Sequence, residues 1–480
     1  MNAPLQRLRC ALAAVCLALL APASAWAQVG WEYTPYAVRV WIAARPQPQL
    51  PAAVQQQVVS EVAARAEVVF GAVWSVQVEM APLSVRDALA AGQELPLARL
   101  AAVAPDATNG DKLIAVRLMR GLSGWEIEAK ELDLRTQQWG TPTRSSAGSI
   151  DALGLATWDA VASAFTPLVR IESVDEKQVV ARLRAGGLIV DAASPALAEP
   201  GMVLRPIVRR NDRSGQPAAK GGIQAIPWTL LSIESREDAL LTCRVYSGYR
   251  SAIPSRGGIR TERLGLLVKP QFAATSLKLL SRGAEPRPLS GYDVYARGAD
   301  GEEAELVGTT DWRGQIEIPR SDGSLRVFLV KNGSQLLARL PMVPGQEPAL
   351  VAPLLDDDSR LQAEGAVAAL YSRALDLAAR REILAARFRA RLKEGKFDEA
   401  QQLLDSFRQL ESRADLGRSL DEQQKLVDAQ DTLTQRRIDK LFGEARKVLL
   451  VRALGDEMVN TLAAELAKAR NPAKTAAAGS

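Results

Sequence analysis

Four carboxylates on one short segment are the clearest candidates for chemistry in this sequence. They are Glu126, Glu128, Glu131 and Asp133, within WEIEAKELDLRT. Two carboxylates roughly 5–9 Å apart can hydrolyse a glycosidic bond, one as the acid and the other as the nucleophile or base. In a strand, Glu126 and Glu128 share one face and Glu131 and Asp133 share one too, as surface-facing residues normally do. We therefore interpret all four as surface residues. A cell-wall glycoside hydrolase or lyase that uses two of these carboxylates is the weaker alternative.

Histidine is absent from the 480 residues. Because histidine is the usual proton shuttle near neutral pH and the commonest metal ligand, Ser-His-Asp and Cys-His machinery and nearly all catalytic zinc sites are excluded. Cys243 lies in the apolar run ALLTCRVYSG, where a thiol behaves as a small hydrophobe. The sequence predicts a non-enzymatic protein, and we assign no catalytic residue, no cofactor-binding residue, no metal ligand and no cofactor.

Three further polar clusters are better explained by turns and helix ends than by ligands. In GTTDWRGQIEIP, Asp311 fits the first position of a type I turn and Gly314 the fourth, with a hairpin strand on either side. The acidic run 356–358 precedes a helical pattern, where acids cap free N–H groups. The basic loop 209–222 reads as a solvated hairpin loop, although it could grip a phosphate or an acidic partner through Arg209, Arg210, Arg213 and Lys220.

Aromatic residues are dense in the first third of a chain in which they make up only 5% overall. Large aromatic side chains usually supply core area, so we interpret them as core and half-buried strand residues. The alternative is a platform that binds a glycan or a peptide. The residues concerned are Trp31, Tyr33, Tyr36, Trp41, Trp74, Trp125, Trp139 and Trp158.

Residues 1–27 have the order of a secretory signal peptide: Arg7 and Arg9, an apolar run, and small residues ending at Ala27. Removing Arg7 and Arg9 from the 60 basic residues leaves 58 against 55 acidic ones, a net charge of about +3. This balance gives no reason to expect nucleic acid. We expect a periplasmic or secreted protein without a transmembrane helix once the signal peptide is cleaved.

The pattern of apolar residues predicts a multidomain α+β protein. Strand, helix, strand, hairpin and helix patterns make residues 28–175 an α/β domain, with the hairpin turn at Gly121–Gly124. Short strands between Gly, Pro and Asp make residues 176–270 a small β-barrel or β-sandwich and residues 271–355 a second β-domain. Apolar stripes at three-four spacing make residues 356–470 an α-helical bundle or coiled coil, whose third helix is expected to run from about 420 to 469. Residues 471–480 have no pattern and are expected to be disordered.

Two resemblances add to this interpretation. The segments GYDVYAR, ELVGTTDWRGQIEIP and LRVFLVKNGSQLLARLPMVPG resemble the carboxypeptidase regulatory-like, transthyretin-like β-sandwich, of immunoglobulin-like type, with the match carried by Thr310, Asp311, Gly314, Ile316 and Ile318. That resemblance covers about 80 residues and implies a non-catalytic module for display, rigidity or protein contact. The element order of residues 28–175 and the run ELDLRT resemble periplasmic domains of assembly factors such as the flagellar protein T and curli-secretion families, and the whole chain resembles an exported bacterial protein.

These observations predict a modular envelope protein that acts as a scaffold or assembly factor. The expected partners are other envelope proteins, with homo-oligomerisation through the C-terminal helices as a further option because long charged helices with a narrow apolar seam suit it. The alternative function is glycan or peptide binding through the N-terminal aromatics.

Overall fold

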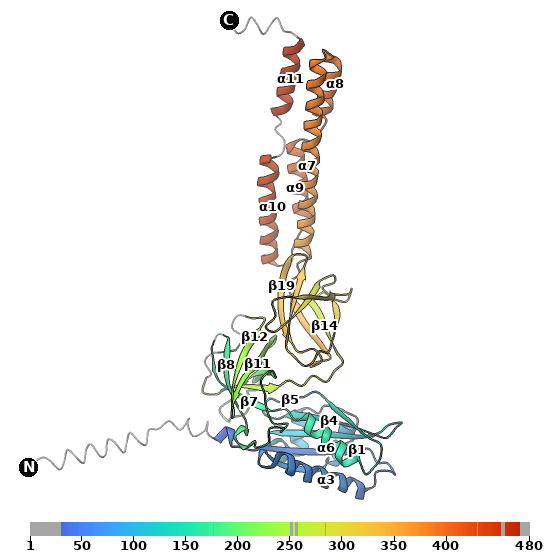
Figure 1. Ribbon diagram of the computed structural model, residues 1–480, viewed down its shortest axis with the longest axis vertical. Helices are drawn as coiled ribbons and strands as arrows, with labels where there is room; N and C mark the ends of the chain where they lie inside the picture. Colours follow the sequence, from blue (N-terminus) through green and yellow to red (C-terminus); the bar gives the residue numbers. More distant parts are fainter. Residues whose placement is uncertain are drawn as a thin grey trace, which may run out of the picture.

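The computed structural model describes residues 30–175, 177–249, 253–254, 258–283, 285–429, 431–452 and 457–470. The expected signal peptide 1–27 and tail 471–480 lie outside these ranges. Figure 1 shows three globular modules and a helical arm that projects from the third. The protein is therefore multidomain α+β, as the sequence predicts. Within the described ranges, no helix is both long and apolar enough to cross a membrane.

The first module is a mixed sheet covered by helices on both faces. Its strand order is β2-β1-β3-β4-β5, with β6 also paired to β4; β1 is parallel to β2 and β3, and the other pairs are antiparallel. Helices α3 and α6 pack on one face, and α4 and α5 on the other. The expected hairpin at Gly121–Gly124 is confirmed, since Gly121 N donates to Gly124 O across the turn. The elements are β1 (Tyr36–Ala44), α3 (Ala52–Phe70), β2 (Trp74–Met80), α4 (Leu83–Ala90), α5 (Leu97–Val103), β3 (Lys112–Arg120), β4 (Trp125–Asp133), β5 (Gln138–Trp139), β6 (Thr143–Ala147) and α6 (Leu153–Ala164).

Most of the aromatic residues of this module are buried, which confirms the core interpretation for them. Phe70 stacks on Trp74 with ring centroids 3.6 Å apart, and Trp158 and Phe165 meet this pair edge-on. Trp139 is half-buried and lies at the edge of the module. The buried aromatics among those predicted are Trp31, Tyr36, Trp41, Trp74, Trp125 and Trp158, whereas Tyr33 is 54% exposed.

The second module is a closed barrel of six strands. It closes because β13 pairs with both β7 and β9, and β10 adds to β9 outside the ring. β7 belongs to this barrel although it precedes residue 175, the expected domain boundary. Cys243 is fully buried inside the barrel, and burial raises the pKa of its thiol to about 12, as expected of a packed, unreactive cysteine. The strands are β7 (Leu168–Val174), β8 (Gln178–Leu183), β9 (Val203–Arg210), β10 (Ile223–Ala225), β11 (Thr229–Glu237), β12 (Leu240–Ser247) and β13 (Thr261–Leu267).

The third module consists of two sheets that share one hydrophobic core, with strand orders β17-β14-β20 and β16-β15-β18-β19. The predicted turn at Asp311 is confirmed: its carboxylate accepts from the backbone N–H groups of Arg313 and Gln315, and Gly314 has φ +70°. The predicted hairpin is wrong, because the strands on either side of this turn belong to different sheets. The strands are β14 (Ala274–Ser281), β15 (Asp293–Gly298), β16 (Glu305–Thr309), β17 (Gln315–Pro319), β18 (Arg326–Asn332), β19 (Gln335–Met342) and β20 (Ala349–Leu354).

The arm is a bundle whose first helix, α7, runs its full length. The chain returns along α7 as α8 and α9, reverses at 427–431, and runs outward again as α10 and α11 (Figure 1). The expected single helix over 420–469 is therefore wrong: the chain leaves helical geometry at Val427, and Asp431 accepts from the first N–H groups of α10. The helices are α7 (Asp358–Lys393), α8 (Phe397–Arg408), α9 (Arg413–Leu426), α10 (Thr432–Arg452) and α11 (Glu457–Arg470).

The acidic run at the start of α7 anchors the arm instead of only capping it. Asp357 is buried and binds Arg360 through both carboxylate oxygens, while Arg360 donates to the carbonyl of Asn332 in the sandwich at 3.0 Å. The Asp357 N–H donates to the Tyr292 hydroxyl at 3.0 Å. The capping expectation thus holds in part, through Asp356 Oδ1, which accepts from the N–H of Asp358 at 3.2 Å.

Substitutions at the Asp311 turn test its structural role. A Cβ on Gly314 would lie 2.5 Å from the carbonyl of Leu279 at an unfavourable φ, so we expect Gly314→Ala to lower the free energy of unfolding of the sandwich by about 2 kcal/mol or more. Asp311→Ala should cost about 1 kcal/mol and Asp311→Asn less, because asparagine keeps the accepting oxygen. Hydrogen exchange of β16 and β17 measures these losses; equal losses for the two Asp311 variants would contradict the acceptor role.

Candidate functional site

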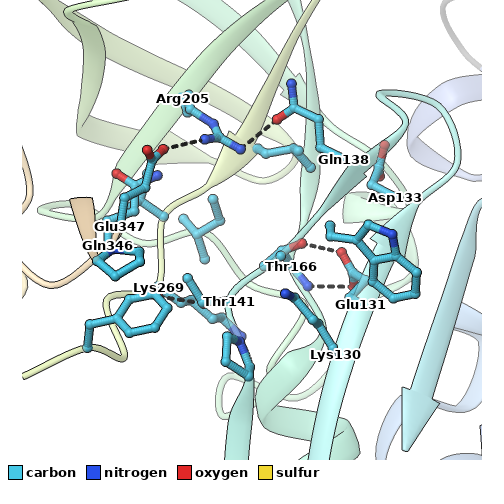
Figure 2. A pocket seen from close by; sticks show the side chains of 18 of the residues that line it. Lys130, Glu131, Asp133, Gln138, Thr141, Thr166, Arg205, Lys269, Gln346 and Glu347 are labelled. Carbon is cyan, nitrogen blue, oxygen red and sulfur yellow. Dashed lines mark hydrogen bonds and ion pairs between the residues drawn. The ribbon is translucent and has the colours of Figure 1, made fainter. Parts of the chain in front are cut away.

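A cavity of about 270 Å³ lies where the three globular modules meet. Its walls come from β4, β5 and the following loop of the first module, from β9 and the end of β13 in the barrel, and from the loop before β20 in the sandwich. Figure 2 shows polar side chains from all three modules around it. Of the sequence candidates, Glu131, Asp133 and Trp139 line this cavity.

Lys112 is fully buried beside this cavity and holds two of the predicted carboxylates. Its Nζ lies 2.8 Å from Glu131 Oε1, 2.7 Å from Asp133 Oδ2 and 2.7 Å from the carbonyl oxygen of Thr166. Two of the three ammonium donors make hydrogen bonds, to Glu131 Oε1 and to the Thr166 carbonyl, and Asp133 Oδ2 is held as an ion-pair partner. Burial opposes the charge on Lys112, but Asp133 and Glu131 raise its pKa above the ordinary value. Lys112 is therefore charged at neutral pH and is surrounded by protein oxygen atoms.

Both carboxylates also accept hydrogen bonds from neighbouring threonines. Glu131 accepts from the Thr166 N–H at 2.9 Å and from the Thr166 hydroxyl. Asp133 Oδ1 accepts from the N–H and hydroxyl of Thr136 at 2.6 and 2.7 Å. Burial raises the pKa of Glu131, and the nearby Lys112 charge opposes that rise. Three of the four carboxylate oxygens accept hydrogen bonds from the protein, and the fourth, Asp133 Oδ2, is buried against the Lys112 ammonium without a hydrogen bond, so the arrangement stabilises the strand ends.

The interpretation of the four carboxylates as surface residues is wrong for Glu131 and Asp133. These two are 1% exposed and share the β4 face of Trp125, Ile127 and Ala129, which packs into the core. Glu126 is exposed, and Glu128 pairs with Arg117 and Arg144 on the opposite face. The structure thus separates the four into a buried pair and an outer pair.

A second lysine on the cavity wall, Lys269, binds the end of a helix. Its Nζ lies 2.6 Å from the carbonyl oxygen of Phe165 and 3.3 Å from that of Ser163, at the C-terminus of α6. Free carbonyl groups at a helix C-terminus attract a cation. Burial lowers the pKa of Lys269 to about 8. The segment after β13 is thereby tied to the first module.

The polar side chains that could hold a ligand line the side of the cavity away from the Lys112 triad (Figure 2). Arg205 of β9 donates to Gln138 Oε1 at 2.5 Å and to Glu347 Oε1 at 2.9 Å, which links the three modules in one chain of side chains (Figure 2). Trp139 also lines the cavity, half-buried against the core beneath α4 and α5, with its Nε1 donating to the carbonyl of Leu95 at 3.3 Å. An aromatic ring with amide, guanidinium and carboxylate groups around a small hollow can hold a small polar molecule.

The other sequence candidates lie away from the cavity. Arg209 of the basic loop is used internally: it donates to Asn211 Oδ1 and to the carbonyl of Arg135, each at 2.8 Å. The loop joins β9 to β10 as a hairpin, as predicted. Asp311 lies in the sandwich, and the acidic run 356–358 lies at the root of the arm. In the ranges the structure describes, no cluster of three or more Cys, Asp or Glu side chains could hold a metal ion.

Sequence reasoning missed Lys112, Thr166, Arg205, Lys269 and Glu347. Lys112 could have been found, because it shares a strand face with Ile114, Val116 and Leu118, an apolar face that points inward. The other four converge from segments far apart in the chain, and no local pattern brings them together.

Replacing Lys112 tests the buried triad. Lys112→Met leaves two buried carboxylates without their cation, so we expect a loss of about 3–5 kcal/mol in the free energy of unfolding at pH 7. The pKa of Glu131 in the folded protein, already raised, should rise further. Since a raised folded-state pKa means that the folded protein binds the extra proton, the loss should shrink as the pH falls from 7 to 5.

Urea-induced unfolding at the two pH values measures this effect, with Lys130→Met as the matched control. Lys130 pairs with Glu94 at the surface, where an ion pair is worth less than about 1 kcal/mol. Equal losses for the two variants, or a loss for Lys112→Met that is unchanged at pH 5, would contradict the role of the triad.

Comparisons with known proteins assign no family. No family model matches the chain, and no curated protein matches it. Among solved structures, TolB from Acinetobacter baumannii is similar at 10% identity over 68% of this chain and 96% of that one, with a TM-score of 0.18. BcpA, the major pilin subunit of Bacillus cereus, is 11% identical over 51% and 71% of the two chains, with a TM-score of 0.13. Scores this low carry no argument about fold or function.

Proposed function

We propose that this chain is a non-enzymatic, exported cell-envelope protein that acts as a modular scaffold or assembly factor. The observation that carries the proposal is the arm. Its 36-residue helix α7 is about 54 Å long at 1.5 Å per residue, and the arm projects from the globular modules (Figure 1). An arm of this length extends the surface available to other proteins far beyond the globular modules.

The arm has the packing of a stable element. One cluster joins α7 to α9 and α10 near the sandwich, and another joins α7 to α8 and α11 at the far end. The Asp357–Arg360 pair and the carbonyl of Asn332 fix its root to the sandwich. A rigid projection suits the presentation of a binding surface, because little conformational entropy is lost when a partner binds.

A structural role for the buried residues supports the non-enzymatic part of the proposal. The triad of Lys112, Glu131 and Asp133 is buried and its charges pair with one another, and the sequence has no histidine. Export is supported by the pattern of residues 1–27, and a display or contact role by the resemblance of residues 271–355 to transthyretin-like modules. Periplasmic or secreted placement remains part of this proposal.

A second candidate function is binding of a glycan or a peptide fragment. The observation that favours it is the junction cavity, whose lining includes Trp139 together with Gln138, Arg205 and Glu347. This candidate keeps the non-enzymatic character of the protein but places its activity between the globular modules instead of on the arm.

Site-specific photo-crosslinking in the native envelope tests the scaffold role. A photoreactive residue replaces Leu433 on α10 or Trp312 in the sandwich, which are 55% and 75% exposed, and Val68 on α3, 84% exposed, serves as the control. We expect discrete protein adducts from Leu433 and Trp312 and none from Val68, because the arm and sandwich present the contact surfaces. Adducts from Val68 alone, or no adduct from any of the three positions, would contradict the scaffold role.

Tryptophan fluorescence tests the cavity. We expect soluble cell-wall glycans or peptides to change the emission of the purified protein only if they reach Trp139, so the change should vanish in Trp139→Phe and persist in Trp158→Phe, whose indole is buried in the core. A change that survives Trp139→Phe would place the ligand elsewhere, and no change at millimolar ligand would remove this candidate.

A further inference from the structure

Helix α7 exposes an uncharged stripe along its full length. Three large apolar residues lie on it, Leu361, Leu375 and Ile383, with 41%, 73% and 52% of their surfaces exposed. Small exposed residues fill the positions between them at three- or four-residue spacing: Gly365, Ala368, Ser372, Ala379, Ala386 and Ala390. At 100° per residue, these positions fall on one narrow face. We call this set the outer stripe.

The outer stripe lies opposite the face that holds the arm together. The buried residues of α7 include Val367, Leu370, Leu377 and Phe388, which pack against the other arm helices. A helix that only covers a bundle has one apolar face and one polar face. Besides its buried face, which includes Arg360 and Arg381, α7 has an uncharged outer face, so the sequence provides a second packing surface that the described residues leave uncovered.

We propose that the outer stripe is a self-association surface, on which α7 of a second copy packs antiparallel. This inference rests on the proposed scaffold role and names one of its partners. In the proposed register, each residue of one helix faces the residue of the other helix whose number brings the sum of the two to 751. Every stripe residue away from the centre then faces another stripe residue: Leu361 faces Ala390, Gly365 faces Ala386, Ala368 faces Ile383, and Ser372 faces Ala379. Leu375 then lies beside the twofold axis.

This register matches large residues with small ones. Away from the axis, each large side chain meets an alanine, so two helices can approach at the short end of the usual 8–10 Å separation along the whole contact. In a parallel pair each residue would face its own copy. Leu361 would meet Leu361 and Ile383 would meet Ile383, while Gly365 and Ala368, which lie between them, would each meet a small residue. Wide and narrow layers would then alternate, which two straight helices cannot satisfy.

Charge favours the same orientation. Residues 376–390 contain four arginines and two acids, whereas residues 361–375 contain Glu364 and Arg373. An antiparallel pair places the positive half of each helix against the neutral half of the other. A parallel pair would place the two positive halves together.

The size of the stripe sets the expected strength. From 361 to 390 it is about 44 Å long, and a contact about 10 Å wide would bury about 900 Å² over both helices. Stable specific interfaces usually bury about 1,200 Å² or more. We therefore expect a weak dimer that forms at micromolar concentration and dissociates on dilution.

Analytical ultracentrifugation of the purified full chain from about 1 to about 100 µM tests this association. We expect the mass to rise towards that of a dimer and Leu375→Arg to abolish the rise. Leu426→Arg is the matched control, because Leu426 on α9 is similarly exposed, at 75%, but lies off the stripe. Circular dichroism establishes that both variants keep their helix content.

Disulfide cross-linking tests the orientation with separately purified chains that carry Ser372→Cys or Ala379→Cys. The antiparallel register predicts rapid cross-linking in a mixture of the two chains and little in either alone; serine replaces Cys10 and Cys16 in both chains, and the native Cys243 is buried and does not contribute. Cross-linking of Ser372→Cys with itself at the rate of the mixture would overturn the antiparallel register. A monomer at every concentration would overturn self-association, yet protein adducts from Leu433 and Trp312 would still support the scaffold role.

Discussion

The ion pair between Lys112 and two buried carboxylates is the interaction on which the globular half of the molecule depends. Lys112 starts β3, Glu131 and Asp133 end β4, and Thr166 begins the segment that enters the barrel. A buried charge without a partner is costly, so these groups must assemble together or the fold loses much of its stability. The triad therefore fixes the paired ends of β3 and β4 and the start of the segment that leads into the barrel.

Local patterns in the sequence predicted the modules well and their connections poorly. Alternation identified β3 and β4 and the Gly121–Gly124 turn, and the Asp311 turn was right in its hydrogen bonds. The strands beside that turn enter different sheets because Gly314 packs against the backbone of Leu279, a contact between distant segments that no local pattern encodes. The same limit applies to β7, which completes a barrel whose other strands lie farther along the chain.

The candidate site shows the same division. The inward direction of Glu131 and Asp133 was present in the sequence, because they continue the apolar face of Trp125 and Ile127. The hydrogen-bonded series Gln138–Arg205–Glu347 could not be predicted from the sequence, since each residue comes from a different module. For the arm, Asp431 offered a helix-start signal that would have divided the long third helix.

The bidentate pair between Asp357 and Arg360 at the root of the arm has a mechanical consequence. The root is held by a few polar contacts to Asn332 and Tyr292, while the arm itself is a packed bundle. Because the arm is long and packed as one bundle, any rotation at this root would be multiplied along its length. Over the length of α7, a rotation of about 10° at the root moves the far end by about 9 Å. A small change at the sandwich surface is thereby converted into a large displacement at the tip, without any change inside the arm.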